Sequence, residues 1–270
     1  MVSTVLNTEV EQRDSAHSVV VAVAFHAVFE AEAPGGDGPT TSPYAMGAAF
    51  PFIQAIQRVN ERLLEKNPSE TLLFDIILIS TEDTEEHQTC SLLSLKHYAL
   101  EISRLCFCAA QDLVEGLRSN NVKLFLSTDS SDVWKATQGG IAGAQVVQQT
   151  ALHSTEQLRV GFYGNAEGFP DDCTASPSDV PDSQEPLREF SALVGRMRQR
   201  FGVLDSPLTT SLITGRGTRN TCLQALKTLR SWGLAVDEAY CLAGAPKDPI
   251  LSLVKPHILV TVGPHSTHAP

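Results

Sequence analysis

Basic residues are scarce in this chain of 270 residues: 20 lysines and arginines stand against 31 aspartates and glutamates, a formal net charge of −11. That deficit disfavours nonspecific binding to nucleic acid or to an anionic membrane, since both attract positively charged surfaces. No run reaches the roughly 18 apolar residues that a membrane-spanning helix needs. The first residues, MVSTVLNTEVEQRDSAHS, also lack the basic-then-apolar pattern of a signal peptide. We therefore expect a cytoplasmic protein that binds neither nucleic acid nor membrane.

Cysteine is sparse and scattered, with six residues in the whole chain. Their spacing shows neither a disulfide framework nor a zinc ribbon. Cys106 and Cys108 form the only close pair, and zinc ligands usually have wider spacing and a second pair. We expect these two thiols to pack as small hydrophobic side chains.

The chain does contain enough apolar residues for a sizeable core, at 42% of its composition. Short β-branched runs alternate with segments of helical periodicity, which is typical of a parallel sheet covered by helices. Strands are expected at residues 19–29, 72–80, 122–128, 158–163, 209–214, 239–243 and 257–262. Helices are expected at residues 50–64, 90–107, from about 133, 187–201 and 218–232. The fold class is therefore predicted as α/β.

Three parts of the chain are expected. Residues 1–17 are polar and predict a flexible N-terminus. Residues 18–150 form an N-terminal α/β half, and residues 151–270 repeat the strand-helix rhythm as a second half. The two halves could also form one compact domain.

The strand LRVGFYGN, residues 158–165, is the first candidate for a functional position. Apolar and other residues alternate along it until a Gly-Asn turn breaks the pattern. Ligands of open α/β sheets bind at the carboxyl ends of the strands. Tyr163 and Asn165 are the side chains that this strand presents there.

Two further turns follow strand ends. In Thr214-Gly215-Arg216-Gly217, a hydroxyl, backbone N–H groups and a guanidinium could surround a phosphate. A plain strand-to-helix turn that uses glycine for its geometry remains the alternative. Lys247, in the turn after residues 239–243, could meet the same anion or could simply be solvated.

Other polar residues receive structural interpretations. His257, His265 and His268 have no flanking cysteine or acidic partner, so we expect a solvated tail rather than a metal site. Asp75, at the head of the second strand, is expected to act as a cap or turn residue. The acidic residues of 171–185 are expected to form a solvated loop that could face a site.

Several segments resemble one known family closely. The segment LKTLRSWGLAVDEAYCLAGAPKDPIL, residues 226–251, is similar to the C-terminal half of the cytosolic 5′-nucleotidase type I family. PLTTSLITGR, FDIILIST, VNERL and GIAGA match in order and spacing, and the similarity runs from about residue 19 to residue 257. This resemblance implies a haloacid-dehalogenase-like (HAD-like) phosphohydrolase with a Rossmann-like sheet. It also implies a Mg²⁺-dependent reaction that converts nucleoside monophosphates, chiefly AMP, to nucleoside and phosphate.

The resemblance also implies roles for particular positions, and several of these hold unexpected residues. The family's aspartate nucleophile falls on Tyr163, and its acid/base aspartate falls on Asn165. The phosphate-binding hydroxyl corresponds to Thr214, with Gly215 and Arg216 in the same turn, and the family's motif lysine corresponds to Lys247. The paired magnesium-binding aspartates correspond to Thr261 and Val262.

The chemistry of these substitutions decides the functional hypothesis. A carboxylate is anionic at neutral pH, binds Mg²⁺ and can form an acyl phosphate. A tyrosine has a pKa of about 10, so about one part in a thousand is ionised at pH 7. Asparagine cannot transfer a proton at a useful pKa, and valine offers a metal no ligand. We therefore predict a catalytically impaired family member that still binds a nucleotide or phosphate and binds Mg²⁺ weakly or not at all.

Two alternatives remain open. The protein could be an active 5′-nucleotidase in which Glu167, Asp171 or Asp172 replaces the missing carboxylates. It could instead be a regulatory or structural partner of an active paralogue that binds no ligand, as a homo- or hetero-oligomer. Binding of AMP and release of phosphate separate the three hypotheses.

Overall fold

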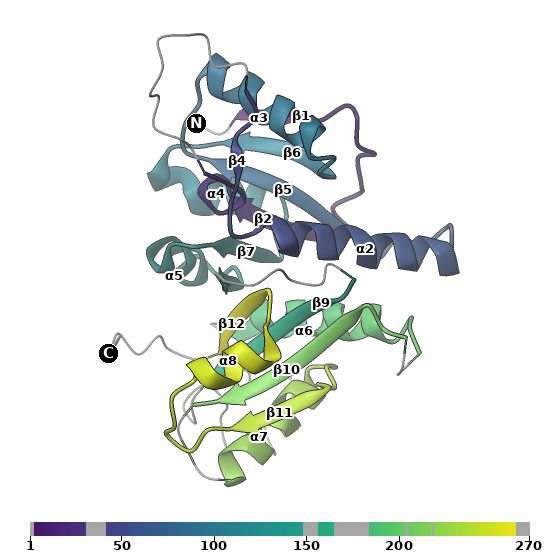
Figure 1. Cartoon of the computed structure of the whole chain (residues 1–270), viewed down its shortest axis with the longest axis vertical. Coiled ribbons are helices and arrows are strands. Elements are labelled where there is room, and N and C mark those ends of the chain that lie inside the picture. Colours follow the sequence, from purple (N-terminus) through teal and green to yellow (C-terminus); the bar gives the residue numbers. More distant parts are fainter. Residues whose placement is uncertain are drawn as a thin grey trace.

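One mostly parallel sheet runs through the whole molecule (Figure 1). The structure is a computed structural model that describes residues 3–30, 42–147, 156–164, 184–202, 205–215, 217 and 219–262. The strands of the large sheet are β1 (Ser3–Leu6), β2 (Val19–Ala24), β5 (Phe74–Ser80), β6 (Ile102–Phe107), β7 (Leu124–Ser127), β8 (Gly143–Val146), β9 (Leu158–Gly164), β10 (Leu208–Thr214), β11 (Glu238–Cys241) and β12 (Ile258–Val262). A separate two-stranded sheet consists of β3 (Phe29–Glu30) and β4 (Ala45–Met46).

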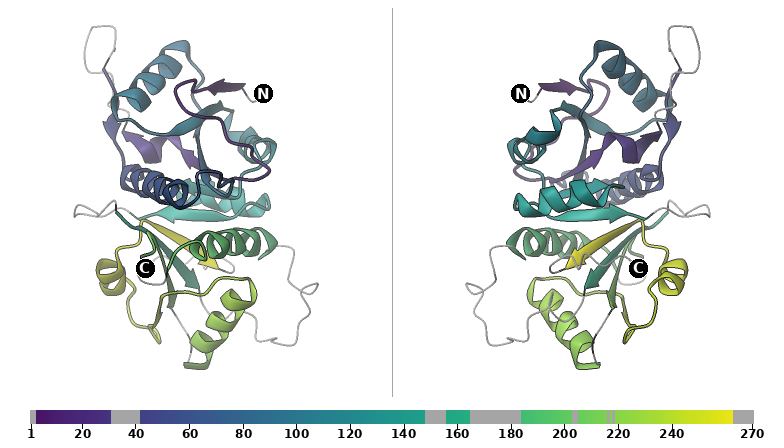
Figure 2. Two further views of the ribbon diagram at one scale, coloured as in Figure 1. Left: turned by 90° about the vertical axis from the view of Figure 1, so that its right-hand side faces the viewer. Right: turned by 90° about the vertical axis from the view of Figure 1, so that its left-hand side faces the viewer.

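Helices cover both sides of the large sheet (Figure 2). They are α1 (Phe25–Val28), α2 (Phe50–Lys66), α3 (Glu85–His97), α4 (Leu113–Ser119), α5 (Ser130–Gln138), α6 (Glu185–Arg198), α7 (Arg219–Ser231) and α8 (Asp248–Val254), with a 3₁₀ turn at Ala110–Asp112 before α4. Within the described residues, no helix has both the length and the apolar character that crossing a bilayer requires. The α/β class predicted from the sequence is confirmed.

The strand order is β1-β6-β5-β2-β7-β8-β12-β9-β10-β11. Strands β6, β5, β2, β7 and β8 are parallel to their neighbours, and so are β12, β9, β10 and β11. The two parallel groups meet at β8 and β12, which pair antiparallel. The carboxyl ends of the N-terminal strands therefore lie at the opposite edge of the sheet from those of the C-terminal strands.

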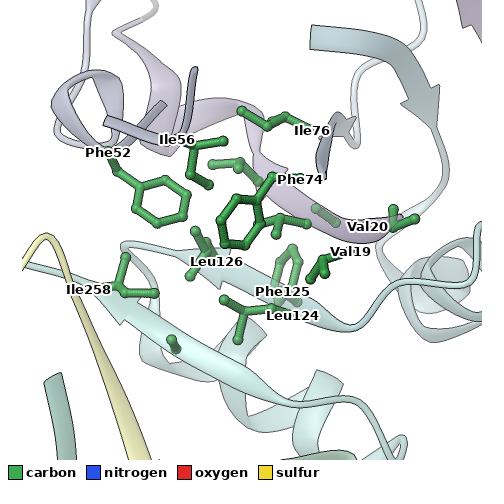
Figure 3. Close-up of a cluster of buried hydrophobic side chains, with 14 of the residues drawn as sticks. Val19, Val20, Phe52, Ile56, Phe74, Ile76, Leu124, Phe125, Leu126 and Ile258 are labelled. Carbon is green, nitrogen blue, oxygen red and sulfur yellow. The ribbon is translucent and has the colours of Figure 1, made fainter. Parts of the chain in front are cut away.

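The core crosses the junction between the two groups. Helix α2 buries Phe52 and Ile56 on its inner face, and Pro51 fits its first turn because that position needs no N–H donor. Figure 3 shows Ile258 of β12 near both side chains, alongside residues of β2, β5 and β7. The N-terminal helix α2 thus shares apolar packing with the C-terminal strands.

Several strands begin or end where the sequence did not indicate. The apolar run from residue 19 stops being a strand at Ala24 and continues as α1. The expectation of one helical segment at 90–107 is wrong, because α3 ends at His97 and β6 follows at Ile102. The backbone turns between them at Ala99, which has a φ of 51°.

The first residues also differ from the expected flexible segment. Strand β1 pairs antiparallel with β6 over four residues. Asn7 then donates its side-chain N–H to the carbonyl of Ile102 at 3.0 Å and is 8% exposed. Ordered pairing of β1 with β6 replaces the expected loose attachment in this part of the chain.

Two polar residues are buried where surface roles were expected. Asp75 lies inside β5 at 2% exposure and forms an ion pair with Arg104 at 2.7 Å, so it is not a cap. His257 is 3% exposed, and its Nδ1 accepts the backbone N–H of Arg159 at 3.0 Å. His257 therefore joins the starts of β12 and β9, whereas His265 and His268 lie outside the described residues.

Candidate functional site

The ends of β9, β10 and β12 lie together because the three strands are adjacent and parallel. Tyr163 pairs with Thr261 on one side and with Ile213 on the other. One residue later, Gly164 pairs with Val262 and Thr214. Since neighbouring strands are about 4.8 Å apart, these predicted positions meet at one edge of the sheet.

The two rows of this edge face opposite sides of the sheet. Paired residues of parallel strands point to the same face, and successive residues alternate. Tyr163 therefore shares a face with Thr261, while Thr214 and Val262 point to the other face. Val262 is 2% exposed and Thr214 is 1% exposed, so this second row is buried.

A tight turn after β11 brings Lys247 to the first row. Ala243 and Gly244 have φ values of 51° and 93°, which reverse the chain directly after the strand. The N–H of Gly244 donates to the carbonyl of Gly215 at 2.9 Å, which ties this turn to the end of β10. The Lys247 ammonium then lies 5.5 Å from the centroid of the Tyr163 ring. That distance is within cation–π range.

Two donors that were expected to surround a phosphate have partners within the chain. The Thr214 hydroxyl donates to the carbonyl of Tyr240 at 3.3 Å. The N–H of Gly215 donates to the carbonyl of Gly164 at 3.1 Å. In this conformation, the exposed Lys247 ammonium is therefore the described cation that an anion at this edge can reach without breaking these bonds. Arg216 and Asn165 lie outside the described residues, as do Glu167, Asp171 and Asp172.

Cys222 of α7 lies close to the same edge, and the Thr214 hydroxyl contacts its thiol. Burial raises the pKa of the Cys222 thiol, and the bond to Thr214 opposes that shift only partly. The thiolate is the reactive form of cysteine. A protonated Cys222 is therefore no substitute for the missing nucleophile.

The described strand ends do not fit a magnesium ion. Mg²⁺ prefers carboxylate and other hard oxygen ligands in octahedral geometry. The first row offers a phenol ring and a hydroxyl at Tyr163 and Thr261, and Val262 offers hydrocarbon. Across the part of the chain that the structure describes, no group of three or more histidine, cysteine, aspartate or glutamate side chains is placed to hold a metal.

A pocket of about 380 Å³ adjoins Thr261 on the side away from Tyr163. Its walls include Trp134 of α5 and Leu187 of α6, neither of which the sequence interpretation singled out. The sequence held no direct sign of this pocket, because α5 reaches the C-terminal strands only through the antiparallel pairing of β8 with β12.

The parallel strands with polar residues at their carboxyl ends define an α/β protein with a Rossmann-like ligand edge. The family model of 5'-nucleotidase matches residues 39–261, most of the chain. The chain belongs to the 5'-nucleotidase family, which confirms the resemblance.

A human relative supports the same conclusion. Cytosolic 5'-nucleotidase 1B of Homo sapiens is 35% identical over 233 residues, which cover 78% of this chain and 38% of that protein. The chain thus spans well under half the length of this relative. Among solved structures, a short chain dehydrogenase from Mycobacterium smegmatis covers 85% of this chain and 93% of its own. Its TM-score is 0.24 and its identity 11%, values too low to carry an argument.

Proposed function

We propose that this protein binds a nucleoside monophosphate such as AMP at the carboxyl ends of β9–β12 but hydrolyses it slowly or not at all. The observation that carries the proposal is the position of Lys247, above the Tyr163 ring and next to Thr261. An ammonium group can attract a phosphate there, but neither described neighbour can attack phosphorus as a carboxylate does. The family's reaction accordingly loses its covalent step while the anion-binding charge stays.

Loss of metal binding follows from the same residues. Without carboxylates in the two rows, Mg²⁺ would have to bind through hydroxyl oxygens and water alone, so we expect weak binding or none. Lys247 and the N-terminus of α7 would then balance the phosphate charge. The name of the human relative places that protein in the cytosol, and we propose a cytosolic location here as well.

Phosphate release from AMP and Mg²⁺ tests the catalytic part of the proposal. We expect turnover far below the roughly 1 s⁻¹ of a slow ordinary enzyme. Turnover at or above that rate would contradict the proposal and favour the active alternative with Glu167, Asp171 or Asp172. Restoring carboxylates by Tyr163→Asp, Asn165→Asp and Thr261→Asp should raise the rate, whereas the matched changes Tyr163→Asn and Thr261→Asn should not.

Binding is tested separately by thermal shift. At 100 times its Kd, AMP should stabilise the protein by about 2.7 kcal/mol. Lys247→Met should weaken this binding, whereas Lys66→Met is a matched control because Lys66 makes a similar contact, 5.0 Å from the Phe201 ring centroid. The absence of any shift at millimolar AMP would favour a regulatory partner that binds no ligand.

A further inference from the structure

The pocket beside Thr261, named here the α5–α6 pocket, lies between the end of α5 and the start of α6. Its volume is about 380 Å³. It is lined by Trp134, Thr137, Gln138, Ile141, Ala142, Gly143, Gln184, Pro186, Leu187 and Thr261. Ligand pockets range from about 300 to 1,000 Å³, so this one suits a single heterocycle with little beyond it.

The sheet topology places this pocket next to the proposed phosphate position. Ala144 of β8 pairs with Val260 of β12, so the start of β8 lies at the same edge as Thr261. Thr261 in turn pairs with Tyr163, one strand further on. A ligand in the pocket is therefore about one strand spacing, roughly 4.8 Å, from the Tyr163 row.

The pocket walls combine one aromatic surface with amides. Trp134 is 42% exposed, an unusual state for a large indole. Leu187 and Ile141 are buried and supply apolar contact. Gln138 carries an amide that can both donate and accept hydrogen bonds. Together these groups suit a flat heterocycle with polar edges.

A glycine allows α5 to lie close enough to form the pocket. A Cβ at Gly143 would come within 2.9 Å of both Thr137 Oγ1 and Val133 Cγ1 of α5. Any larger residue at this position would push α5 away from β8. The close approach keeps Trp134 over the edge where β12 ends.

We infer that the α5–α6 pocket holds the nucleobase of the ligand, stacked on Trp134, while the phosphate lies near Lys247. This inference rests on the proposed function and adds the position and chemistry of base recognition. Glutamine amides pair well with the N6 and N7 edge of adenine, which makes Gln138 a second contact for AMP. The base end of the nucleotide is thus bound by the N-terminal half and the phosphate end by the C-terminal half.

Fluorescence tests this arrangement directly, because the chain has two tryptophans. Trp232 is 5% exposed and is removed by Trp232→Phe, so that Trp134 alone reports. AMP and adenosine should quench this signal, whereas ribose 5-phosphate and inorganic phosphate should leave it unchanged. If Trp232→Phe lowers stability, the same titration of the unchanged protein gives the same ordering of ligands.

Calorimetric binding of AMP gives the second test. Trp134→Ala should weaken AMP binding about 5- to 100-fold, as expected for loss of a base–aromatic stack, and should not affect inorganic phosphate. Trp134→Phe should keep most of the affinity. Leu93→Ala is the control, since Leu93 is a partly exposed apolar residue of α3 away from this pocket.

The outcomes separate this inference from the proposed function. If AMP binds and Trp134→Ala changes nothing, the base position is wrong and the proposed function stands. If adenosine binds with quenching but neither AMP nor phosphate shows a contribution from Lys247, the base pocket stands and the phosphate position fails. If none of the four ligands binds at millimolar concentration, both are wrong.

Discussion

The two parallel groups of strands end in very different surroundings. In the N-terminal half, the carboxyl ends of β5 and β7 are filled by paired side chains. Ser80 contacts His87 Nε2 at 3.0 Å, and the Tyr44 hydroxyl contacts His87 Nδ1 at 3.1 Å. Ser127 contacts His26 at 3.0 Å. Polar groups at this edge therefore bind one another.

In the C-terminal half, the corresponding edge carries one loose contact in its first row. The Lys247 ammonium lies 5.5 Å from the Tyr163 ring centroid, and Lys247 is exposed. Such a contact is weak at an exposed site, at about 0.5–1 kcal/mol, and an anion can compete with it. The comparison teaches that a parallel-sheet edge is a place for a ligand only where its polar groups are not already bound to one another.

Truncating one aromatic ring at each edge should give the largest difference. Phe25 is 7% exposed and packs against Tyr44 and His87, with ring centroids 5.2 and 4.4 Å away. Phe25→Ala should reduce the free energy of unfolding by about 3–5 kcal/mol, because it leaves a cavity. Tyr163→Ala should cost about 1 kcal/mol or less. Urea unfolding measures both, and equal losses would remove the contrast between the edges.

A pH titration sharpens the comparison with a smaller effect. Burial lowers the pKa of His87, although Glu82 and Asp83 oppose the shift. The unfolded chain then binds protons more readily, at a pKa near 6.5. The contribution of His87 to stability is fully present above pH 6.5 and falls below it, by at most about 1.4 kcal/mol per pH unit.

The variant His87→Gln isolates this effect. It should flatten the loss of stability between pH 6.5 and 5 relative to the unchanged protein, measured by urea unfolding at each pH. His17→Gln is the control, since His17 is exposed and contacts Asp14 on the surface. If His87→Gln leaves the pH dependence as steep as before, the buried histidine is not its source.

Much of the fold was predictable because buried strands show in the sequence as apolar runs. Strands β5, β9, β10 and β12 fell close to their expected positions for this reason. Strand β6 was missed because the turn before it uses Ala99 at a positive φ, where glycine would have marked the break. Strand β8 is four residues long and begins at Gly143, so only its pairing partners identify it.

The candidate site was predictable in part. The sequence predicted that Tyr163, Thr214 and Lys247 follow strand ends, and the register brings those ends together. It did not show that Thr214 faces the opposite side from Tyr163 and binds the carbonyl of Tyr240, because that depends on strand register. The α5–α6 pocket depends on the antiparallel pairing of β8 and β12, and no local pattern encodes such a long-range contact.

The smallest expected effect concerns the contact between Lys247 and Tyr163. A double-mutant cycle with Lys247→Met and Tyr163→Leu should give a coupling energy of about 0.5–1 kcal/mol in thermal unfolding. The contact between Lys66 and Phe201, at 5.0 Å, provides a matched cycle with Lys66→Met and Phe201→Leu. Saturating AMP should abolish the first coupling, since the phosphate draws the Lys247 ammonium away from the ring, and should leave the second unchanged. A Lys247–Tyr163 coupling that persists unaltered with bound AMP would show that the C-terminal edge is closed by its own side chains, as the N-terminal edge is.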